Sequence, residues 1–305
     1  KVKMILQGET VQKEKPKTKP KEEIKVQIKK FQKGKTYIII TIGSVASGKS
    51  TIYKILNQTI QENHSEDFEL YYISSDQMKK SLMDECMKKN PNLTHNQAHD
   101  IINKKSSGKF NRELNGLIFK ADNPNKINLV FIDKNFPIEH ANKLISEYKN
   151  KDFIVLYPNT TAEKENTTRL PFSFNYMIQC YYRLKNRKDH ETLDFEKDEY
   201  AHYILFSFMS LYKNEKIVFN QKNVQAYPLS FTDEETVIEY DSYFIYLFDR
   251  MMHIMSKNTF RVEQLKSHNQ HIQEVIDFIE TTYPESLYKD TRETIKAEIK
   301  ALLNN

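Results

Sequence analysis

A glycine-containing segment between an apolar run and an amphipathic stretch constrains the fold of this chain more than any other feature. Residues 43–50 read GSVASGKS, which matches the phosphate-binding pattern GxxxxGK[ST]. The chain has six glycines, and Gly43 and Gly48 are the two that the pattern requires. Residues 37–42 (YIIITI) are typical of a strand buried on both faces, and residues 50–61 have helical apolar spacing. The segment therefore predicts a strand–loop–helix unit that binds a nucleoside triphosphate.

Each part of this loop has a chemical role in the predicted site. Successive backbone N–H groups and a helix N-terminus form a cradle for anions, and glycines permit its tight path. The lysine would reach the β- and γ-phosphates, and the hydroxyl of the next residue would ligate Mg²⁺. The residues predicted to bind the nucleotide are Gly43, Ser47, Gly48, Lys49, Ser50 and Thr51.

The hydrophobic pattern predicts an α/β fold of the P-loop NTPase type, with a parallel sheet flanked by helices. Apolar runs that read as strands alternate with segments of helical periodicity, which indicates parallel βαβ units. After Pro158 the pattern becomes helical, and we expect a helical lid and a helical C-terminal half. The expected strands cover residues 37–42, 68–74, 127–132 and 153–157. The expected helices cover residues 50–61, 78–89, 94–121, 138–148, 174–188, 200–212, 235–253 and 264–305.

Composition divides the chain into three parts. Residues 12–35 hold ten lysines and few apolar side chains, so we expect residues 1–35 to be a flexible tail or linker. This tail would be a solvated spacer or an electrostatic guide for nucleic acid. Residues 36–160 form the predicted kinase core, and residues 161–305 form the lid and the C-terminal helices packed on it.

Two carboxylates follow predicted strands and therefore belong at the ligand-binding edge of a parallel sheet. Asp76 could accept a proton from an attacking hydroxyl, or it could merely cap the helix that follows. Asp133 ends another strand, as does the acidic residue that holds Mg²⁺ in P-loop enzymes, although strand-terminal aspartates are also common in turns. Lys79, one helical turn after Asp76, could hold a substrate phosphate.

Two arginines in the helical half are the remaining candidates for catalysis. Arg183 and Arg187 are four residues apart, so both can point from one face of a helix. An arginine there could neutralise the charge that develops on a transferred phosphoryl group. The alternative is a solvated basic face.

Five motifs in this order resemble the central polynucleotide kinase domain of plant and fungal tRNA ligases, closest to the plant type. The resemblance covers residues 36–230 and more loosely the helices to residue 305. The motifs are the phosphate loop, Asp76–Lys79, the run Asp133-Lys134-Asn135-Phe136-Pro137, the segment Pro171-Phe172-Ser173, and Arg183, Arg187 and His190.

The resemblance implies a polynucleotide 5′-hydroxyl kinase that transfers the γ-phosphate of GTP or ATP to an RNA end. It implies Asp76 as general base, Lys79, Lys134 and Asn135 as substrate-binding residues, and Arg187 or Arg183 as the lid arginine. Ser50 and Asp133 would hold Mg²⁺. The RNA would carry a 5′-OH, as tRNA exon halves do, and the ligase and phosphodiesterase domains of those enzymes would lie outside this chain.

Composition is compatible with these expectations but leaves alternatives open. The net charge of +5 suits a polyanionic partner, and no apolar run is long enough to span a membrane. The two cysteines lie far apart, so we expect a reducing compartment, nuclear or cytoplasmic. The alternatives are a P-loop kinase for a small molecule and a nucleotide-binding scaffold without turnover.

Overall fold

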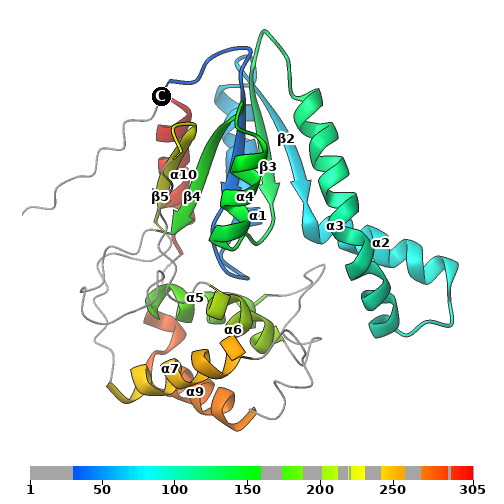
Figure 1. The fold of residues 1–305 in the computed structure, drawn as a ribbon. Helices are drawn as coiled ribbons and strands as arrows, with labels where there is room; N and C mark the ends of the chain where they lie inside the picture. Colours follow the sequence, from blue (N-terminus) through cyan, green and yellow to red (C-terminus); the bar gives the residue numbers. More distant parts are fainter. Residues whose placement is uncertain are drawn as a thin grey trace, which may run out of the picture.

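The protein is an α/β structure built on one parallel sheet. The computed structural model describes residues 30–158, 174–187, 201–211, 219, 221–230, 242–257, 269–287 and 290–304. Five parallel strands lie in the order β2-β3-β1-β4-β5. The strands are β1 (Thr36–Thr41), β2 (Phe68–Ser74), β3 (Ile127–Asp133), β4 (Asp152–Pro158) and β5 (Val224–Leu229) (Figure 1).

The two central strands form the core because their side chains are apolar on both faces. Every residue of β1 and of β3 is buried. Their register pairs Ile38 with Val130 and Ile40 with Ile132, and β4 continues the sheet by pairing Val155 with Ile40. This pattern is the one expected of a parallel sheet covered by helices on both faces.

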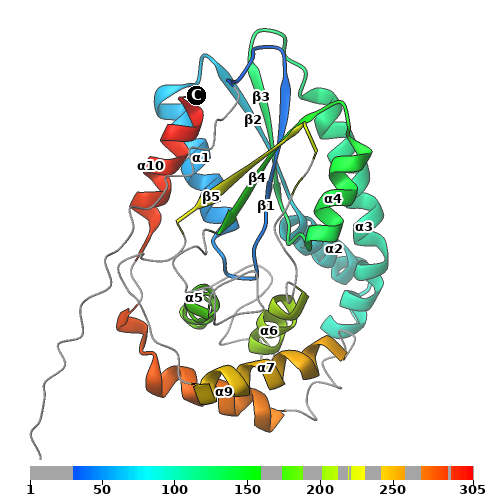
Figure 2. The ribbon, with the colours of Figure 1, turned by 60° about the vertical axis from the view of Figure 1, so that its left-hand side comes forward.

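Helices cover both faces of the sheet. The helices in the first part of the chain are α1 (Lys49–Asn63), α2 (Ser75–Lys89), α3 (His95–Lys120) and α4 (Ile138–Glu147), and the chain ends with α10 (Arg292–Leu303). Figure 2 shows α1 and α10 on one face, and α3 and α4 on the other. None of the helices described is both long and apolar enough to cross a membrane.

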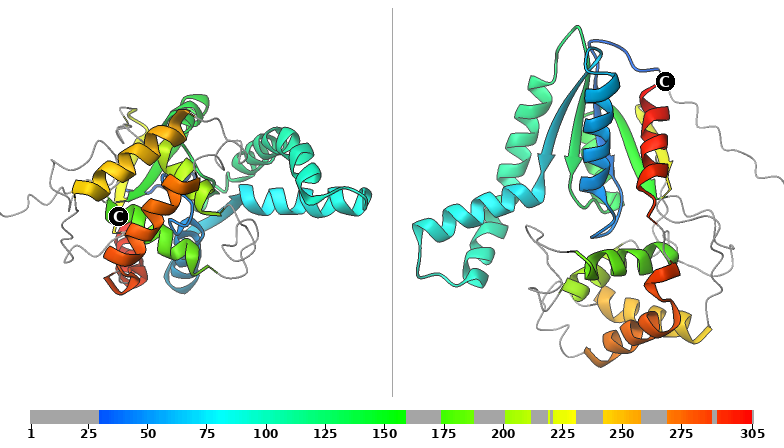
Figure 3. Two further views of the ribbon diagram at one scale, coloured as in Figure 1. Left: turned by 90° about the horizontal axis from the view of Figure 1, so that it is seen from below. Right: turned by 180° about the vertical axis from the view of Figure 1, so that it is seen from behind.

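A layer of helices lies against the carboxyl end of the sheet. Its members are α5 (Phe174–Lys185), α6 (Ala201–Leu211), α7 (Ser242–Lys257) and α9 (Asn269–Thr282), and a short 3₁₀ helix, η1 (Glu285–Leu287), follows them. Figures 1 and 3 show this layer below the loops that end the strands. Because ligands of parallel sheets bind at the carboxyl ends of strands, the layer encloses the place where a ligand is expected.

The structure confirms the predicted fold class and the four predicted strands, with two differences in the C-terminal half. Residues 224–229 form the edge strand β5 in a region expected to be helical. Their sequence, VQAYPL, is weakly apolar and contains Pro228, which suits a strand only at an edge. The predicted helix over 264–305 is interrupted around Pro284, because proline cannot continue a helix.

The last residues of the predicted tail contact the core. Phe31 packs edge-to-face against Tyr37 and Phe68, with ring centroids 4.9 and 5.4 Å apart. The Gly34 N–H donates to the Lys126 carbonyl at 2.8 Å. These contacts close the end of the sheet opposite the helical layer.

Candidate active site

The phosphate loop connects β1 to α1 at the carboxyl end of the sheet. Gly48 precedes α1 with φ 86°, and Ala46 also has a positive φ of 59°. Gly43 is required for another reason: a Cβ there would lie 2.7 Å from Ser47 Oγ and 2.9 Å from the Tyr176 hydroxyl oxygen. No side chain caps α1. The first N–H groups of α1 therefore lack intrahelical partners and can bind an anion.

Lys49 is buried at the centre of this loop. Its Nζ donates to the Ser44 carbonyl at 2.7 Å and to Ser47 Oγ at 3.1 Å. Burial lowers the pKa of Lys49, and the nearby carboxylates of Asp133 and Asp76 partly oppose that shift. A phosphate group would supply the negative charge that a buried ammonium needs.

Asp133 accepts two hydrogen bonds at one oxygen. Ser50 Oγ donates to Asp133 Oδ2 at 2.7 Å, and the Tyr72 hydroxyl donates to the same oxygen at 2.8 Å. Tyr72 stacks on Tyr53 of α1, with ring centroids 3.8 Å apart. Burial and Asp133 raise the pKa of Tyr72, so this hydroxyl stays protonated as a donor. Tyr72 was not among the predicted site residues, because one tyrosine in an alternating strand carries no local signal of a distant partner.

The pair Ser50–Asp133 fits a magnesium ion bound together with a nucleotide. Both residues offer oxygen, the donor that Mg²⁺ prefers, and Mg²⁺ is commonly held by one or two protein oxygens plus substrate phosphates. In the described part of the chain, no cluster of three His, Cys, Asp or Glu residues could hold a metal alone. These residues would therefore hold Mg²⁺ only when phosphates complete its coordination.

Asp76 does not act as the cap of α2. The helix begins at Ser75, and its N-cap is Ser74, whose hydroxyl accepts the Gln77 N–H at 3.3 Å. Asp76 lies in the first turn and lines the cavity described below. Its carboxylate forms no hydrogen bond or ion pair with any described residue. The capping alternative is therefore wrong, and the carboxylate is available for a ligand.

Lys134 directly follows β3, and Lys79 lies in the second turn of α2. Lys134 Nζ lies over the ring of Phe110, 4.8 Å from its centroid, and 5.7 Å from that of Phe136. Burial lowers the pKa of Lys134, and the nearby charge of Lys79 adds to that effect. Lys134 and Asn135 line the cavity, and the buried Asn135 Oδ1 has no hydrogen-bond partner among the described residues. Lys79 is exposed and lies outside the cavity lining.

Both candidate arginines face the phosphate loop. An Arg183 Nη atom lies 3.7 Å from the position that a Gly48 Cβ would occupy, and another donates to Thr291 Oγ1 at 3.3 Å. Burial lowers the pKa of Arg187, and Asp76 and Asp133 oppose that shift. Both side chains are half-buried and line the cavity, which excludes the solvated basic face as their environment.

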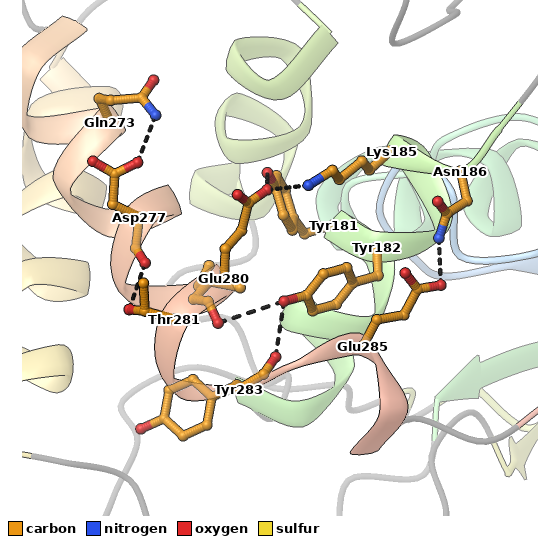
Figure 4. A network of polar contacts seen from close by, with 11 residues as sticks. Tyr181, Tyr182, Lys185, Asn186, Gln273, Asp277, Glu280, Thr281, Tyr283 and Glu285 are labelled. Atoms are coloured by element: carbon orange, nitrogen blue, oxygen red, sulfur yellow. Dashed lines mark hydrogen bonds and ion pairs between the residues drawn. The ribbon is translucent and has the colours of Figure 1, made fainter.

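A polar network fixes the helix that carries these arginines (Figure 4). Glu280 of α9 accepts a hydrogen bond from the Tyr181 hydroxyl at 2.7 Å and forms an ion pair with Lys185. The Tyr182 hydroxyl donates to the Tyr283 carbonyl at 2.9 Å, and the Asn186 amide donates to Glu285. Through these contacts α9 and η1 hold α5 in place over the phosphate loop.

The phosphate loop, Asp76, Asp133 and the two arginines line one cavity of about 490 Å³. Its walls come from the phosphate loop, from the carboxyl ends of β2 and β3, from α5, and from the segment that leads into α10. Thr291, Arg292 and Ile295 belong to this last wall and were not predicted. They lie about 240 residues after the loop in sequence, so no local pattern could connect them to it. The volume is within the roughly 300–1,000 Å³ range of small-molecule sites.

Some predicted features lie outside the described residues. These are the segment Pro171-Phe172-Ser173 and His190. The remaining predicted site residues are described, and all except Gly43 and Lys79 line the cavity.

Comparisons with known proteins give weak similarities. No protein-family model matches this chain, and no curated protein is significantly similar to it. Among solved structures it is similar to a fungal RNA kinase, with 13% identity and a TM-score of 0.41, over 90% of this chain and 99% of that one. It is also similar to a structure from the PezAT chromosomal toxin-antitoxin system of Streptococcus pneumoniae, with 14% identity and a TM-score of 0.26, over 82% and 90%. Such values establish no family, so the residues of this chain carry the functional inference.

Proposed function

We propose that this protein is a P-loop kinase that transfers the γ-phosphate of GTP or ATP to the 5′-hydroxyl of an RNA end. One observation carries the proposal: Lys49, Ser50, Asp76, Asp133 and Arg187 line the same cavity. These are an anion-binding lysine, a hydroxyl–carboxylate pair suited to Mg²⁺, a carboxylate with no hydrogen bond or ion pair to the described residues, and an arginine. A scaffold needs only the nucleotide-binding part of this set.

In this reaction the protein positions the reactants and stabilises charge. Lys49 and the N–H groups of the loop would bind the β- and γ-phosphates, and Asp76 would accept the proton of the attacking hydroxyl. Arg187, with Arg183 beside the loop, would stabilise the charge on the transferred group. Magnesium, when bound with the nucleotide, would supply further charge neutralisation at the phosphates.

The test is a transfer assay with Mg²⁺ and γ-labelled GTP or ATP. RNA oligonucleotides of one sequence, ending in 5′-OH or in 5′-phosphate, are compared as acceptors with a free nucleoside. We expect label on the 5′-OH RNA and none on the 5′-phosphate RNA, and a lower KM for the 5′-OH RNA than for the nucleoside. Lys49→Met is the matched inactive control, because it keeps the length of the side chain and removes its charge.

The outcomes separate the alternatives. Equal transfer to the nucleoside and to RNA would favour a small-molecule kinase. Nucleotide binding without transfer to any acceptor would favour the scaffold, and unchanged binding in Lys49→Met would refute the phosphate-loop assignment itself.

A further inference from the structure

The hairpin of α2 and α3 extends away from the rest of the molecule. We call residues 75–109, which comprise α2 and the first half of α3, the basic arm. Figures 1 and 3 show this arm extending from the carboxyl end of the sheet, away from the sheet and the helical layer. Of the residues of α2, Met78 is buried, and α2 packs mainly on α3. The second half of α3 is different, since Phe110, Leu114 and Ile118 are buried in the core.

The arm carries an excess of cations that have no ion-pair partner among the described residues. It contains seven lysines and four acidic residues. Lys89 pairs with Glu85, and Lys109 pairs with Glu113. The remaining lysines are exposed and form no ion pair with a described residue; they are Lys79, Lys80, Lys88, Lys104 and Lys105. Exposed cations that no carboxylate neutralises form a surface suited to a polyanion.

The arm begins at the active site. Asp76, the candidate base, is in the first turn of α2, and Lys80 lies one turn further along the same face. Lys134 lines the cavity and lies close enough to Lys79 for their charges to interact. Positive charge therefore continues from the cavity onto the arm. A strand whose 5′ end lies beside Asp76 can leave the cavity along this helix.

The described side chains of the arm expose little of the apolar surface that a protein partner would need. Among the described residues of the arm, Ile101 is the one large hydrophobic residue that is exposed, at 38%. Protein interfaces have a hydrophobic core, whereas nucleic-acid surfaces are dominated by cations that contact phosphates. The charge and the position beside the acceptor site favour a nucleic acid.

We propose that the basic arm binds the RNA strand that extends from the acceptor nucleotide, with the lysines contacting its phosphates. This inference rests on the proposed function and adds a binding surface outside the cavity. The 15 residues of α2 span about 22 Å. At about 3.4 Å per stacked nucleotide, this length corresponds to roughly six nucleotides. The gain in affinity with RNA length should therefore stop at about seven nucleotides.

The test compares two variants, each of which removes three lysine charges. The arm variant replaces Lys80, Lys104 and Lys105 with Gln. The control variant makes the same change at Lys54, Lys143 and Lys149, which are exposed on other parts of the molecule. Fluorescence anisotropy measures the binding of 5′-OH RNA of two to twelve nucleotides. The measurement is made without GTP or ATP, so it does not depend on catalysis. Circular dichroism and thermal melting verify that each variant is folded.

We expect the arm variant to bind a ten-nucleotide RNA at least tenfold more weakly than the parent, and the control variant to bind within about twofold. Each phosphate contact to a single strand contributes about 0.7 to the slope of log affinity against log salt, so three lost contacts should reduce that slope by roughly 2. KM for the ten-nucleotide acceptor should rise in parallel, and KM for a dinucleotide much less.

Equal weakening in both variants, or affinity independent of length beyond two nucleotides, would overturn the role of the arm. Such a result with intact 5′-phosphorylation would leave the proposed function standing. Absence of phosphate transfer to any RNA, with the binding difference between the variants preserved, would instead refute the proposed reaction.

Discussion

Lys49 contacts two groups of its own loop, and the lowering of its pKa has a measurable consequence. Burial is the main cause of the shift, and a bound triphosphate would raise the pKa again by adding negative charge next to Nζ. Between the pKa of the free protein and that of the complex, binding must take up a proton. Affinity should therefore fall as the pH rises through the lowered pKa.

Isothermal titration calorimetry can measure this proton uptake. Titrations in two buffers of different ionisation enthalpy, at alkaline pH below the ordinary lysine value of 10.5, should give different binding heats. The sign of the difference between the two binding heats should correspond to protons taken up by the complex. Lys49→Met should abolish the uptake; heats that are the same in both buffers for the parent protein would contradict the prediction.

Asp76 can be tested with little risk to the fold, because it has no hydrogen bond or ion pair with the described residues. Asp76→Asn keeps the shape of the side chain and removes its ability to accept a proton as a carboxylate. We expect kcat to fall by about 10²- to 10⁴-fold, the usual contribution of a general base. Nucleotide affinity and Tm should stay close to those of the parent. A variant with normal kcat would exclude Asp76 as the base.

At the scale of elements, one substitution should have opposite effects in the phosphate loop and in α3. Gly43→Ala places a Cβ within 3.0 Å of Ser47 Oγ and the Tyr176 hydroxyl oxygen, so the loop must shift. Gly116 lies in the exposed interior of α3, with no heavy atom within 4 Å of a Cβ there. Alanine at that position should raise the free energy of unfolding by about 1 kcal/mol.

Urea denaturation and nucleotide titration measure both effects. Gly43→Ala should lower the stability and weaken nucleotide binding at least tenfold, whereas Gly116→Ala should leave binding as it is. Nucleotide affinity equal to that of the parent in Gly43→Ala would show that the loop accommodates the methyl group.

The elements also differ in how well the sequence predicts them. Four strands of the sheet were predictable because apolar side chains on both faces produce unbroken apolar runs. The edge strand β5 was not, since VQAYPL is weakly apolar, and its pairing with β4 depends on residues some 70 positions earlier. The start of α2 was misplaced because Ser74, rather than a later residue, supplies the cap.

At the scale of the whole molecule, the cavity joins the sheet to the helical layer and to the chain's last helix. A nucleotide that contacts Lys49, Arg183 and Arg187 should therefore stabilise α1 and α5 together. Amide hydrogen exchange should slow in α1, α5 and the start of α10 when Mg²⁺ and nucleotide are added. At a nucleotide concentration of 100 times Kd, the stabilisation should be about 2.7 kcal/mol. Protection confined to α1 would indicate that the helical layer does not engage the nucleotide.

The sequence by itself determined the phosphate loop, the α/β class and the candidates Lys49, Ser50, Asp76 and Asp133. Each of these can be recognised from neighbouring residues or from the spacing of apolar residues along the chain. Only the tertiary structure decided which of these side chains share a cavity. It also revealed that Tyr72 donates to Asp133, 61 residues away, and that Thr291 contacts Arg183, 108 residues away. Such contacts depend on how distant elements pack, and packing leaves no periodic signal in the sequence.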